Sequence, residues 1–406
     1  MADLKQADLK PVEAALAALL EGVQPLGSER IPCDRAAGRI LAEPVAASLD
    51  VPPFDNSAMD GYALHHRDAG RWLRVNQRIA AGATGEPLAA DSCARIFTGG
   101  AIPAGADCVV MQESVESDGD RVHVPAGIPA GDNIRRRGRD VTAGSELLPA
   151  GEPLEAAALG HLAGQGITEV TVRRRPRVAL LSTGDEIVDP GRPLGPGQIY
   201  NSNRPMLKRL LERFGAEVVR VAAIPDDAEG TRLALATAAR EADVVVTTGG
   251  VSVGEEDHVR GAVEALGELD LWRLAIRPGK PLALGRLPDG EREARFVGLP
   301  GNPVSGFVGA WLFLRPLMGA LLGAPSLAEL PELAARADFA TRTGPRAHYM
   351  RVRLEFGPEG ITAHAFRDQN SGVLSSCIAA DALAVIPPNR EVAPGDSVNC
   401  LWLRGA

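Results

Sequence analysis

Residues 244–257 read VVVTTGGVSVGEED, and this stretch decides the predicted fold of the chain. Its three valines and two threonines are typical of a buried strand. Gly249 and Gly250 then predict a sharp turn, because only glycine turns this tightly without a clash of its Cβ. The acids at 255–257 follow at the predicted start of a helix over residues 259–266.

A strand, a glycine turn and a helix N-terminus together form a common anion site at the carboxyl end of a sheet. Carboxylates in such a turn repel a bare phosphate, but they fit if a divalent cation bridges them to it. The alternative is an ordinary strand-to-helix loop with solvated acids at the helix start. This stretch alone leaves both interpretations open.

Length and composition indicate a globular protein of several domains. The chain has 406 residues, which is room for roughly two to four domains. Hydrophobic residues make up 45% and charged residues 23%, as in soluble proteins. No apolar run approaches the roughly 20 residues needed to span a bilayer, and residues 1–5 lack the apolar core of a signal peptide. We therefore expect a cytoplasmic protein with no membrane partner.

Charge and cysteine spacing argue against two further classes of protein. The net charge of −9, from 43 basic and 52 acidic residues, disfavours a nucleic-acid partner. Arginine triplets at 135–137 and 173–175 are too short for a binding stripe, and a solvated face or an anion contact is the expected explanation. The five cysteines lie far apart, so they predict free thiols and neither a disulfide framework nor a zinc site. The histidines likewise show no ligand spacing.

From residue 177 onward, predicted strands alternate with predicted helices. The strands are expected at 177–182, 218–224, 244–248, 282–285 and 296–299. The helices are expected at 204–214, 228–241 and about 304–322. This alternation predicts a largely parallel sheet that helices cover on both faces.

Acidic residues follow three of these strands, at 185–186, 226–227 and 255–257. Right-handed crossovers place the carboxyl ends of parallel strands along one edge of a sheet, so these acids are predicted to converge. Solvation alone explains such convergence poorly, whereas a hard cation such as Mg²⁺ explains it well. Arg277 and Lys280, held between prolines, add fixed positive charge. We therefore predict a site for phosphate with a metal ion, or for an oxyanion.

The remaining segments are predicted to be helical or rich in β-structure. Residues 10–23 and 154–162 form amphipathic helices that we expect to pack together, with a β segment inserted between them. Near the C-terminus, apolar and charged residues alternate over 350–356, which predicts a strand with one buried and one wet face. Phe356 falls on the buried face of this strand and Arg351 on the wet face.

Six separated motifs together resemble one family. They are PFDNSAMDGYA at 53–63, FTG at 97–99, NIRRRG at 133–138, STGDE at 182–186, GGVSVG at 249–254 and LPGNPVS at 299–305. Each motif alone is weak, but all of them in this order resemble the MoeA family of molybdopterin molybdenumtransferases. The same family occurs as the E domain of gephyrin and of its plant counterpart. The resemblance covers nearly the whole chain.

The resemblance implies a multi-domain α/β and β protein. Its expected parts are a discontinuous helical domain I (1–45 plus 140–175), an inserted β domain II (46–139), a central, largely parallel α/β molybdopterin-binding domain III (176–325) and a C-terminal β barrel-like domain IV (326–406). It also implies an elongated homodimer, with a cleft between domain II of one subunit and domains III and IV of the other. The molybdopterin adenylyltransferase and the apo-proteins of molybdoenzymes are the implied transient partners.

The implied reaction is insertion of molybdate into adenylylated molybdopterin, with release of AMP and formation of molybdenum cofactor. Mg²⁺ or a similar divalent ion is the implied cofactor. Two alternatives stay open: a scaffold or interaction protein with the same fold, and a pyrophosphate hydrolase that acts on another nucleotide.

The resemblance also implies site residues, position by position. The expected catalytic positions are Asp60, Thr98, Asp140, Glu186, Asp226 and Asp257, of which the last three are also the expected metal ligands. The expected positions for cofactor or molybdate binding are Gly249, Gly250, Ser252, Arg277, Lys280, Pro300, Pro303, Ser305, Arg351 and Ser371. The chain departs from the family at Arg277, where lysine is common; the positive charge is kept, but a guanidinium and an ammonium bind an oxyanion with different geometry.

Overall fold

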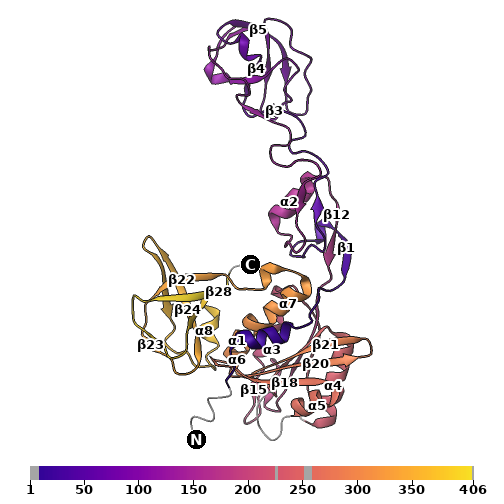
Figure 1. The fold of residues 1–406 in the computed structure, drawn as a ribbon, viewed down its shortest axis with the longest axis vertical. Helices are drawn as coiled ribbons and strands as arrows, with labels where there is room; N and C mark the ends of the chain where they lie inside the picture. The colour runs from indigo at the N-terminus through magenta and orange to yellow at the C-terminus, as the bar shows by residue number, and fades with distance from the viewer. Residues whose placement is uncertain (1–8, 225–226, 251–257, 405–406) are drawn as a thin grey trace.

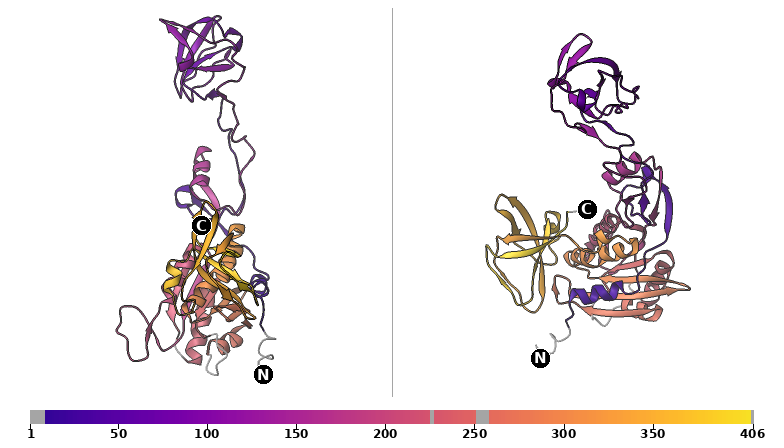
Figure 2. Two further views of the ribbon diagram at one scale, coloured as in Figure 1. Left: turned by 90° about the vertical axis from the view of Figure 1, so that its left-hand side faces the viewer. Right: turned by 45° about the horizontal axis from the view of Figure 1, so that its top comes forward.

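The computed structural model describes residues 9–224, 227–250 and 258–404. The molecule is elongated, with a small β domain at one end that two extended stretches of chain connect to the rest (Figure 1). The views of Figure 2 show the same separation from other directions. The central α/β domain and the C-terminal β domain lie side by side at the opposite end (Figure 1).

A six-stranded sheet forms the central domain, in the order β16–β13–β17–β21–β20–β18. The strands are β13 (Arg177–Ser182), β16 (Glu217–Ala223), β17 (Val244–Thr248), β18 (Glu268–Arg273), β20 (Pro281–Asp289) and β21 (Arg292–Leu299). The first four in this order are parallel, β20 runs antiparallel to β21, and β18 runs antiparallel to β20 and thus in the direction of the first four. The expectation of a largely parallel sheet is confirmed. Val244, Val245 and Val246 on the inner strand β17 are fully buried, because helices cover both faces.

The helices of this domain divide between the two faces. α4 (Ala228–Glu241) and α5 (His258–Leu266) pack on one face. α3 (Asn203–Arg213) and the long helix made of α6 (Pro303–Gly309), η5 (Ala310–Leu314) and α7 (Arg315–Leu322) pack on the other. The helices predicted at 204–214, 228–241 and 304–322 are thus present.

The long helix is a core helix that contains a π-helical turn, η5. Pro316 follows this turn, and a proline lacks the N–H that a regular helix needs and clashes with the carbonyl four residues earlier. The wider turn accommodates both effects. Among the described helices, only Pro303–Leu322 is long and apolar enough to cross a membrane, with a mean hydropathy of 1.4, but 89% of its apolar window is buried inside the protein. Here the helix serves as part of the core.

The N-terminal helix α1 (Val12–Leu20) has a different partner from the one expected. Val12, Ala15 and Leu19 are buried in the cluster that contains α3 and the long helix. α2 (Ala156–Gly164) buries Ala158 and Leu162 in a separate cluster. The prediction that these two helices pack together is therefore wrong, because an apolar face shows that a helix needs a partner but does not specify which one.

The segment around α2 contains strands as well as the helix. β1 (Ser28–Pro32) pairs antiparallel with β12 (Glu169–Arg173), and β2 (Val45–Ala46) pairs antiparallel with β11 (Glu146–Leu148). The chain therefore leaves this small unit and returns to it on paired strands.

The inserted domain is a β domain, as predicted. Its sheet has the order β7–β4–β6–β5–β9–β8. The strands are β4 (Gly61–Leu64), β5 (Trp72–Ile79), β6 (Ser92–Ile96), β7 (Cys108–Met111), β8 (Glu116–Asp118) and β9 (Arg121–His123). Buried side chains form separate clusters on its two faces. A short pair, β3 (Asn56–Ser57) and β10 (Ile134–Arg135), lies where the chain enters and leaves it.

The C-terminal domain is a closed barrel, as the resemblance implied. Its strands pair in the order β24–β25–β22–β28–β26, and a further pairing between β24 and β26 closes the ring. They are β22 (Glu332–Ala337), β24 (Ala347–Gly357), β25 (Gly360–Ala365), β26 (Ala382–Ile386) and β28 (Ser397–Trp402). Met350, Val352 and Leu354 are buried as predicted, but Phe356 is 62% exposed and Arg351 is 0% exposed. The alternating pattern therefore fails at these two positions.

The cysteines are free thiols, as predicted. Burial raises the pKa of Cys93 and Cys108 to about 12, so both thiols stay protonated at neutral pH. The arginine triplets mostly form internal contacts. Arg136 bonds Asp55 at 2.6 Å, and Arg174 donates two hydrogen bonds of 2.8 Å to Asp243.

The ion pair between Asp243 and Arg174 anchors the amino ends of the sheet strands. Asp243 also accepts the Arg177 N–H at 2.8 Å, and its side chain is only 10% exposed. Burial raises the pKa of Asp243, but the hydrogen bonds from Arg174 and Arg177 outweigh burial and hold the pKa below its usual value.

We expect Asp243→Ala to lower the free energy of unfolding by roughly 3 kcal/mol, because it leaves a partly buried guanidinium without its partner. Glu241→Ala is the matched control. It removes the half-exposed pair with Arg220, which stabilises by less than about 1 kcal/mol. Urea unfolding of the three proteins measures both values, and equal losses in the two variants would contradict this interpretation.

Candidate functional site

The carboxyl ends of β13, β17 and β21 lie next to one another at one edge of the central sheet. Ser182 is opposite Thr248, and Thr248 is opposite Leu299. The turns that follow are also bonded, since the Thr183 N–H donates to the Thr248 carbonyl (3.2 Å) and the Gly249 N–H donates to the Leu299 carbonyl (3.0 Å). Three loops that are distant in sequence therefore form one surface.

Glycine is required at both positions of the turn after β17. Gly249 has φ +86°, and a Cβ there would lie 2.6 Å from Thr183 Oγ1. Gly250 has φ +64°, and a Cβ there would lie 2.6 Å from Val259 Cγ2. Both distances are far below van der Waals contact, so any side chain would push these loops apart. The bare backbone at this edge leaves room for a ligand to approach closely.

Only part of the expected acidic cluster lies in the described residues. Asp226, Asp257 and Ser252 fall outside them, so the convergence of three acids stays a prediction. Glu186 is exposed, and its carboxylate folds back over the turn, since a Cβ at Gly184 would lie 2.4 Å from Glu186 Oε2. An exposed carboxylate oxygen beside a glycine turn fits a hard cation such as Mg²⁺.

Asp227, which the sequence placed in the same acidic group, serves a helix. Its Oδ1 accepts the Gly230 N–H at 2.7 Å and so caps α4. This is the ordinary function of an aspartate directly before a helix.

The loop 277–280 holds two cations beside the barrel. Arg277 belongs to β19 (Ile276–Arg277), which pairs in parallel with β24. The Leu274 N–H donates to the Lys280 carbonyl at 2.7 Å, which closes the loop. Arg277 and Lys280 are exposed, and the described part of the chain contains no carboxylate within ion-pair distance of either. Cations fixed in this way can bind an anion by charge-assisted hydrogen bonds.

Two other segments meet this loop. Pro300 and Pro303 flank the turn that leads into α6, and Ser305 in the first turn of that helix is 3% exposed. A Cβ at Gly279 would lie 3.8 Å from Ser305 Cβ, so the loop 277–280 packs against this helix start. The Val304 N–H donates to the Ser371 carbonyl at 3.0 Å. The structure therefore brings the segments of Lys280, Ser305 and Ser371 together.

Arg351 lies in a different environment from the one expected. The sequence placed it on a wet face and among the molybdate-binding positions, but it is fully buried. Its Nε donates to Ser376 Oγ (3.0 Å), Nη1 to the Gln369 carbonyl (3.0 Å) and Nη2 to the Asn370 carbonyl (3.1 Å). The guanidinium is tolerated in the interior because its donors are satisfied. In this structure it holds the loop that carries Ser371.

His348 is a candidate that the sequence analysis did not single out. It lies opposite Arg277 in the β19–β24 pairing and is 6% exposed. Burial lowers the pKa of His348 to about 4, with further contributions from Arg277, Arg351 and Arg346. Its Nε2 is buried and has no hydrogen-bond partner among the described residues. No spacing rule identifies such a histidine, because its burial depends on the contact between two domains.

Two buried amides connect the start of α3 with the sheet edge. Asn203 Nδ2 donates to the Gly301 carbonyl (2.7 Å), and Asn201 Nδ2 donates to Ser182 Oγ (3.0 Å). Asn201 Oδ1 also accepts the Arg204 N–H (3.0 Å). Sequence reasoning missed both residues, although asparagines directly before a predicted helix are a signal for capping.

The expected residues of the inserted domain form a separate group. Asp60 Oδ1 accepts both the Thr98 N–H and the Thr98 hydroxyl at 2.8 Å. These bonds lower the pKa of Asp60. Asp140 lies elsewhere, 3.8 Å from His161 of α2. β4, next to Asp60, lies at the far end of the molecule from β20 and β21 (Figure 1), so a single chain does not bring Asp60 and Thr98 to the sheet edge.

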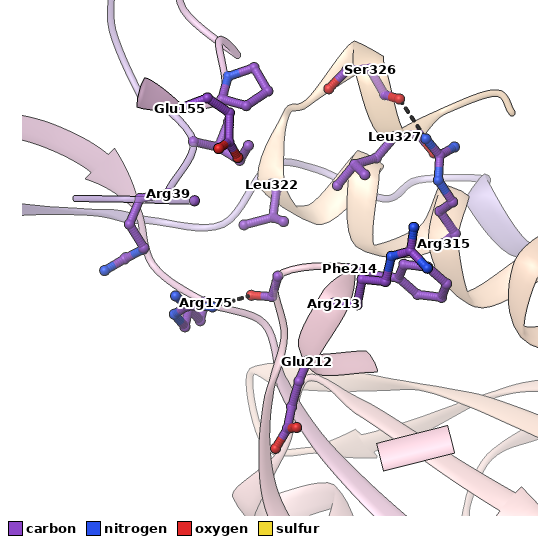
Figure 3. A pocket seen from close by; sticks show the side chains of 14 residues that line it. Arg39, Glu155, Arg175, Glu212, Arg213, Phe214, Arg315, Leu322, Ser326 and Leu327 are labelled. Atoms are coloured by element: carbon purple, nitrogen blue, oxygen red, sulfur yellow. Dashed lines mark hydrogen bonds between the residues drawn. The ribbon is translucent and has the colours of Figure 1, made fainter. Parts of the chain in front are cut away.

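A cavity of about 240 Å³ lies away from the expected site residues, between the α2 unit and the central domain (Figure 3). Arginines line it, but they bond protein carbonyls. Arg315 Nη2 donates to the Ser326 carbonyl (2.8 Å), and Arg175 Nη1 donates to the Gly215 carbonyl (3.4 Å). None of the expected site residues that the structure describes lines this cavity, which lies at the contact between two packed parts of the chain.

The burial of His348 predicts a measurable pH dependence. Its pKa is 6.5 ordinarily and about 4 in the folded chain, so the unfolded chain binds a proton first as the pH falls. As the pH falls from 6.5 to 4, we expect protonation of His348 in the unfolded chain to lower the free energy of unfolding by about 1.4 kcal/mol per pH unit. Urea unfolding at several pH values should show a shallower slope for His348→Gln than for the wild type. Parallel slopes would contradict the assignment.

Comparison with known proteins agrees with this architecture. Three family models match consecutive parts of the chain: the MoeA N-terminal region (domain I and II) at residues 10–166, a probable molybdopterin binding domain at 179–320 and the MoeA C-terminal region (domain IV) at 334–403.

The relatives match over most of their length. The molybdopterin molybdenumtransferase of Haemophilus influenzae is 37% identical over 92% of this chain and 93% of that protein. The molybdopterin molybdenumtransferase of a Nostoc species is 37% identical over 87% of this chain and 83% of that protein. The crystal structure of the molybdopterin biosynthesis MoeA protein from Pyrococcus horikoshii superposes with a TM-score of 0.84 at 28% identity, over 97% of this chain and 100% of that one.

Proposed function

The chain belongs to the MoeA family of molybdopterin molybdenumtransferases, and on that premise we propose that it transfers molybdenum from molybdate to molybdopterin. The observation that carries the proposal is the meeting of the loop 277–280, the start of α6 and the segment of Ser371 beside the sheet edge. This arrangement offers fixed cations and hydroxyl groups next to a glycine turn that accepts a phosphate-bearing ligand.

Molybdate is a tetrahedral dianion, and the described residues offer it complementary groups. Lys280 and Arg277 hold it by charge-assisted hydrogen bonds, and the hydroxyls of Ser305 and Ser371 add neutral donors. The N-terminus of α6 contributes its positive dipole end. Much of the rate gain comes from positioning, because an oxyanion held against the dithiolene of molybdopterin no longer has to find it by diffusion.

The finer parts of the proposal concern the activated substrate. We infer that molybdopterin enters as the adenylylated form and that the pyrophosphate bond to AMP breaks during the reaction. Glu186, with Asp226 and Asp257, would hold Mg²⁺, which would neutralise charge at the phosphates. We expect the protein to work in the cytoplasm, with a molybdopterin adenylyltransferase and molybdoenzyme apo-proteins as transient partners.

We also propose a homodimer in which the inserted domain of one subunit completes the site of the other. Its support is the separation of β4, which Asp60 directly precedes, from β20 and β21 of the central sheet within one chain (Figure 1). A symmetric dimer uses each contact twice, so each inserted domain completes the site of the other subunit and the dimer has two complete sites.

Molybdate dependence tests the proposed function directly. The protein is incubated with adenylylated molybdopterin and Mg²⁺, with and without molybdate, and AMP release is followed by chromatography. We expect molybdate to be required and the product to reconstitute a cofactor-free molybdoenzyme. AMP release without molybdate would indicate a hydrolase, and no release under any condition would indicate a scaffold.

We expect Lys280→Met to raise the KM for molybdate about 10- to 100-fold, because it removes a hydrogen bond to a charged ligand. The control is Lys208→Met, which changes a lysine on α3 that pairs with Glu212. Steady-state AMP release at varied molybdate concentration measures both variants. An unchanged KM in Lys280→Met would refute the assignment of Lys280.

Mixing two inactive variants tests the shared site. We expect Asp60→Ala and Glu186→Ala each to be inactive, because each damages both sites of its own dimer. After random exchange of subunits, half of the dimers are mixed and each has one intact site, so about a quarter of the wild-type activity should return. If each site came from one chain, exchange would restore nothing. Native mass spectrometry confirms that exchange has occurred.

A further inference from the structure

Three potential metal ligands meet on the inserted β domain, at the opposite end of β4 from Asp60. His65 and His66 follow β4, with His66 at the start of the short helix η3 (His66–Asp68), and Asp107 directly precedes β7. One ligand atom from each residue lies within 4.8 Å of the other two. The spacing of the histidines in the sequence does not reveal this cluster, because its carboxylate comes from a position 41 residues away from His66.

The Asp107 carboxylate is held in a fixed orientation. Its Oδ1 accepts the His66 backbone N–H at 2.6 Å. Its Oδ2 therefore points toward both rings, 2.5 Å from His66 Nδ1 and 3.7 Å from His65 Nε2. The two imidazoles stack on each other, with ring centroids 4.8 Å apart. In metal sites, a ligating carboxylate is commonly held in orientation by a hydrogen bond to one of its oxygens, while the other oxygen binds the ion.

Two imidazoles and one carboxylate form a ligand set for divalent first-row transition metals, and above all for Zn²⁺. The side chains of His65, His66 and Asp107 are 39%, 34% and 29% exposed, so an ion can reach them and water can complete its coordination. Ligands about 2 Å from a tetrahedral ion lie roughly 3.3 Å apart. Small side-chain rotations are enough to reach that spacing from the observed distances.

We propose that His65, His66 and Asp107 bind a divalent transition-metal ion of the Zn²⁺ class. This site differs in chemistry from the proposed Mg²⁺ site at the edge of the central sheet, for which only carboxylate ligands are proposed. A cavity of about 310 Å³ lies beside His65, which lines it together with Arg67, Asp68 and Ser92 among others.

Two hydrogen bonds limit the strength of the site: the bond between His66 Nδ1 and Asp107 Oδ2 (2.5 Å), which the metal ion would replace, and a bond to His65. Its Nδ1 accepts the Arg67 N–H at 3.2 Å, so metal binding through Nε2 requires the ring proton to move to Nδ1 and this bond to be released. The bond is long and belongs to a single short turn. Asp68, which also faces this turn, is paired with Arg71. The site is therefore an exchangeable one, weaker than a closed structural zinc site.

The experiment uses the full chain without a purification tag, stripped of metal and kept in excess Mg²⁺ so that carboxylate sites are filled. Calorimetric titration with Zn²⁺ should show one equivalent bound per chain. Titration with Co²⁺ should give the visible absorption of a nitrogen- and oxygen-ligated ion. His65→Gln and His66→Gln should each weaken Zn²⁺ binding at least about 10-fold, whereas His123→Gln, in β9 of the same domain, should bind like the wild type.

Asp107→Asn separates ligation from folding, because an amide oxygen can still accept the His66 N–H. Thermal unfolding should show that Zn²⁺ stabilises the wild type and His123→Gln but not the three cluster variants. Absence of a Zn²⁺ equivalent in the wild type, or equal binding by the His65→Gln/His66→Gln double variant, would overturn the proposal. Neither result bears on molybdate-dependent AMP release, so the proposed function stands or falls separately.

Discussion

The parallel, in-register pairing of β13, β17 and β21 is the constraint on which the rest of the structure depends. Because all three strands end at the same level, the turns after Ser182, Thr248 and Leu299 form a single surface. Backbone hydrogen bonds between these turns then fix their relative positions. The glycines at 249 and 250 follow from this arrangement, since side chains there would collide with Thr183 and Val259.

The barrel completes the proposed site through backbone contacts as well as side chains. β19 leaves the central domain and pairs with β24, and the Val304 N–H reaches the Ser371 carbonyl. Arg351 supports this junction from inside, because its guanidinium bonds the loop that precedes Ser376. A buried cation is costly unless each donor is satisfied, so the loop and Arg351 stabilise each other. The position of Ser371 thus depends on the packing of two domains.

The elongated shape gives the chain two groups of functional residues that do not meet. Asp60 and Thr98 bond each other in the inserted domain, while β20 and β21 of the central sheet lie at the other end of the molecule from β4 (Figure 1). The composite site proposed between two subunits would bring the groups together. His65, His66 and Asp107 form a third group, at the opposite end of β4 from Asp60.

The sequence by itself determined the helices and five of the six sheet strands of the central domain, all but the edge strand β18, together with the glycine turns and the β character of the inserted and C-terminal domains. These follow from local periodicity and from glycine sterics, which act within a few residues. Only the tertiary structure decided that α1 packs on the central domain, that Arg351 and His348 are buried, and that His65, His66 and Asp107 meet. The physical reason is that burial and ligand geometry arise from contacts between segments far apart in the chain, and no local pattern encodes them.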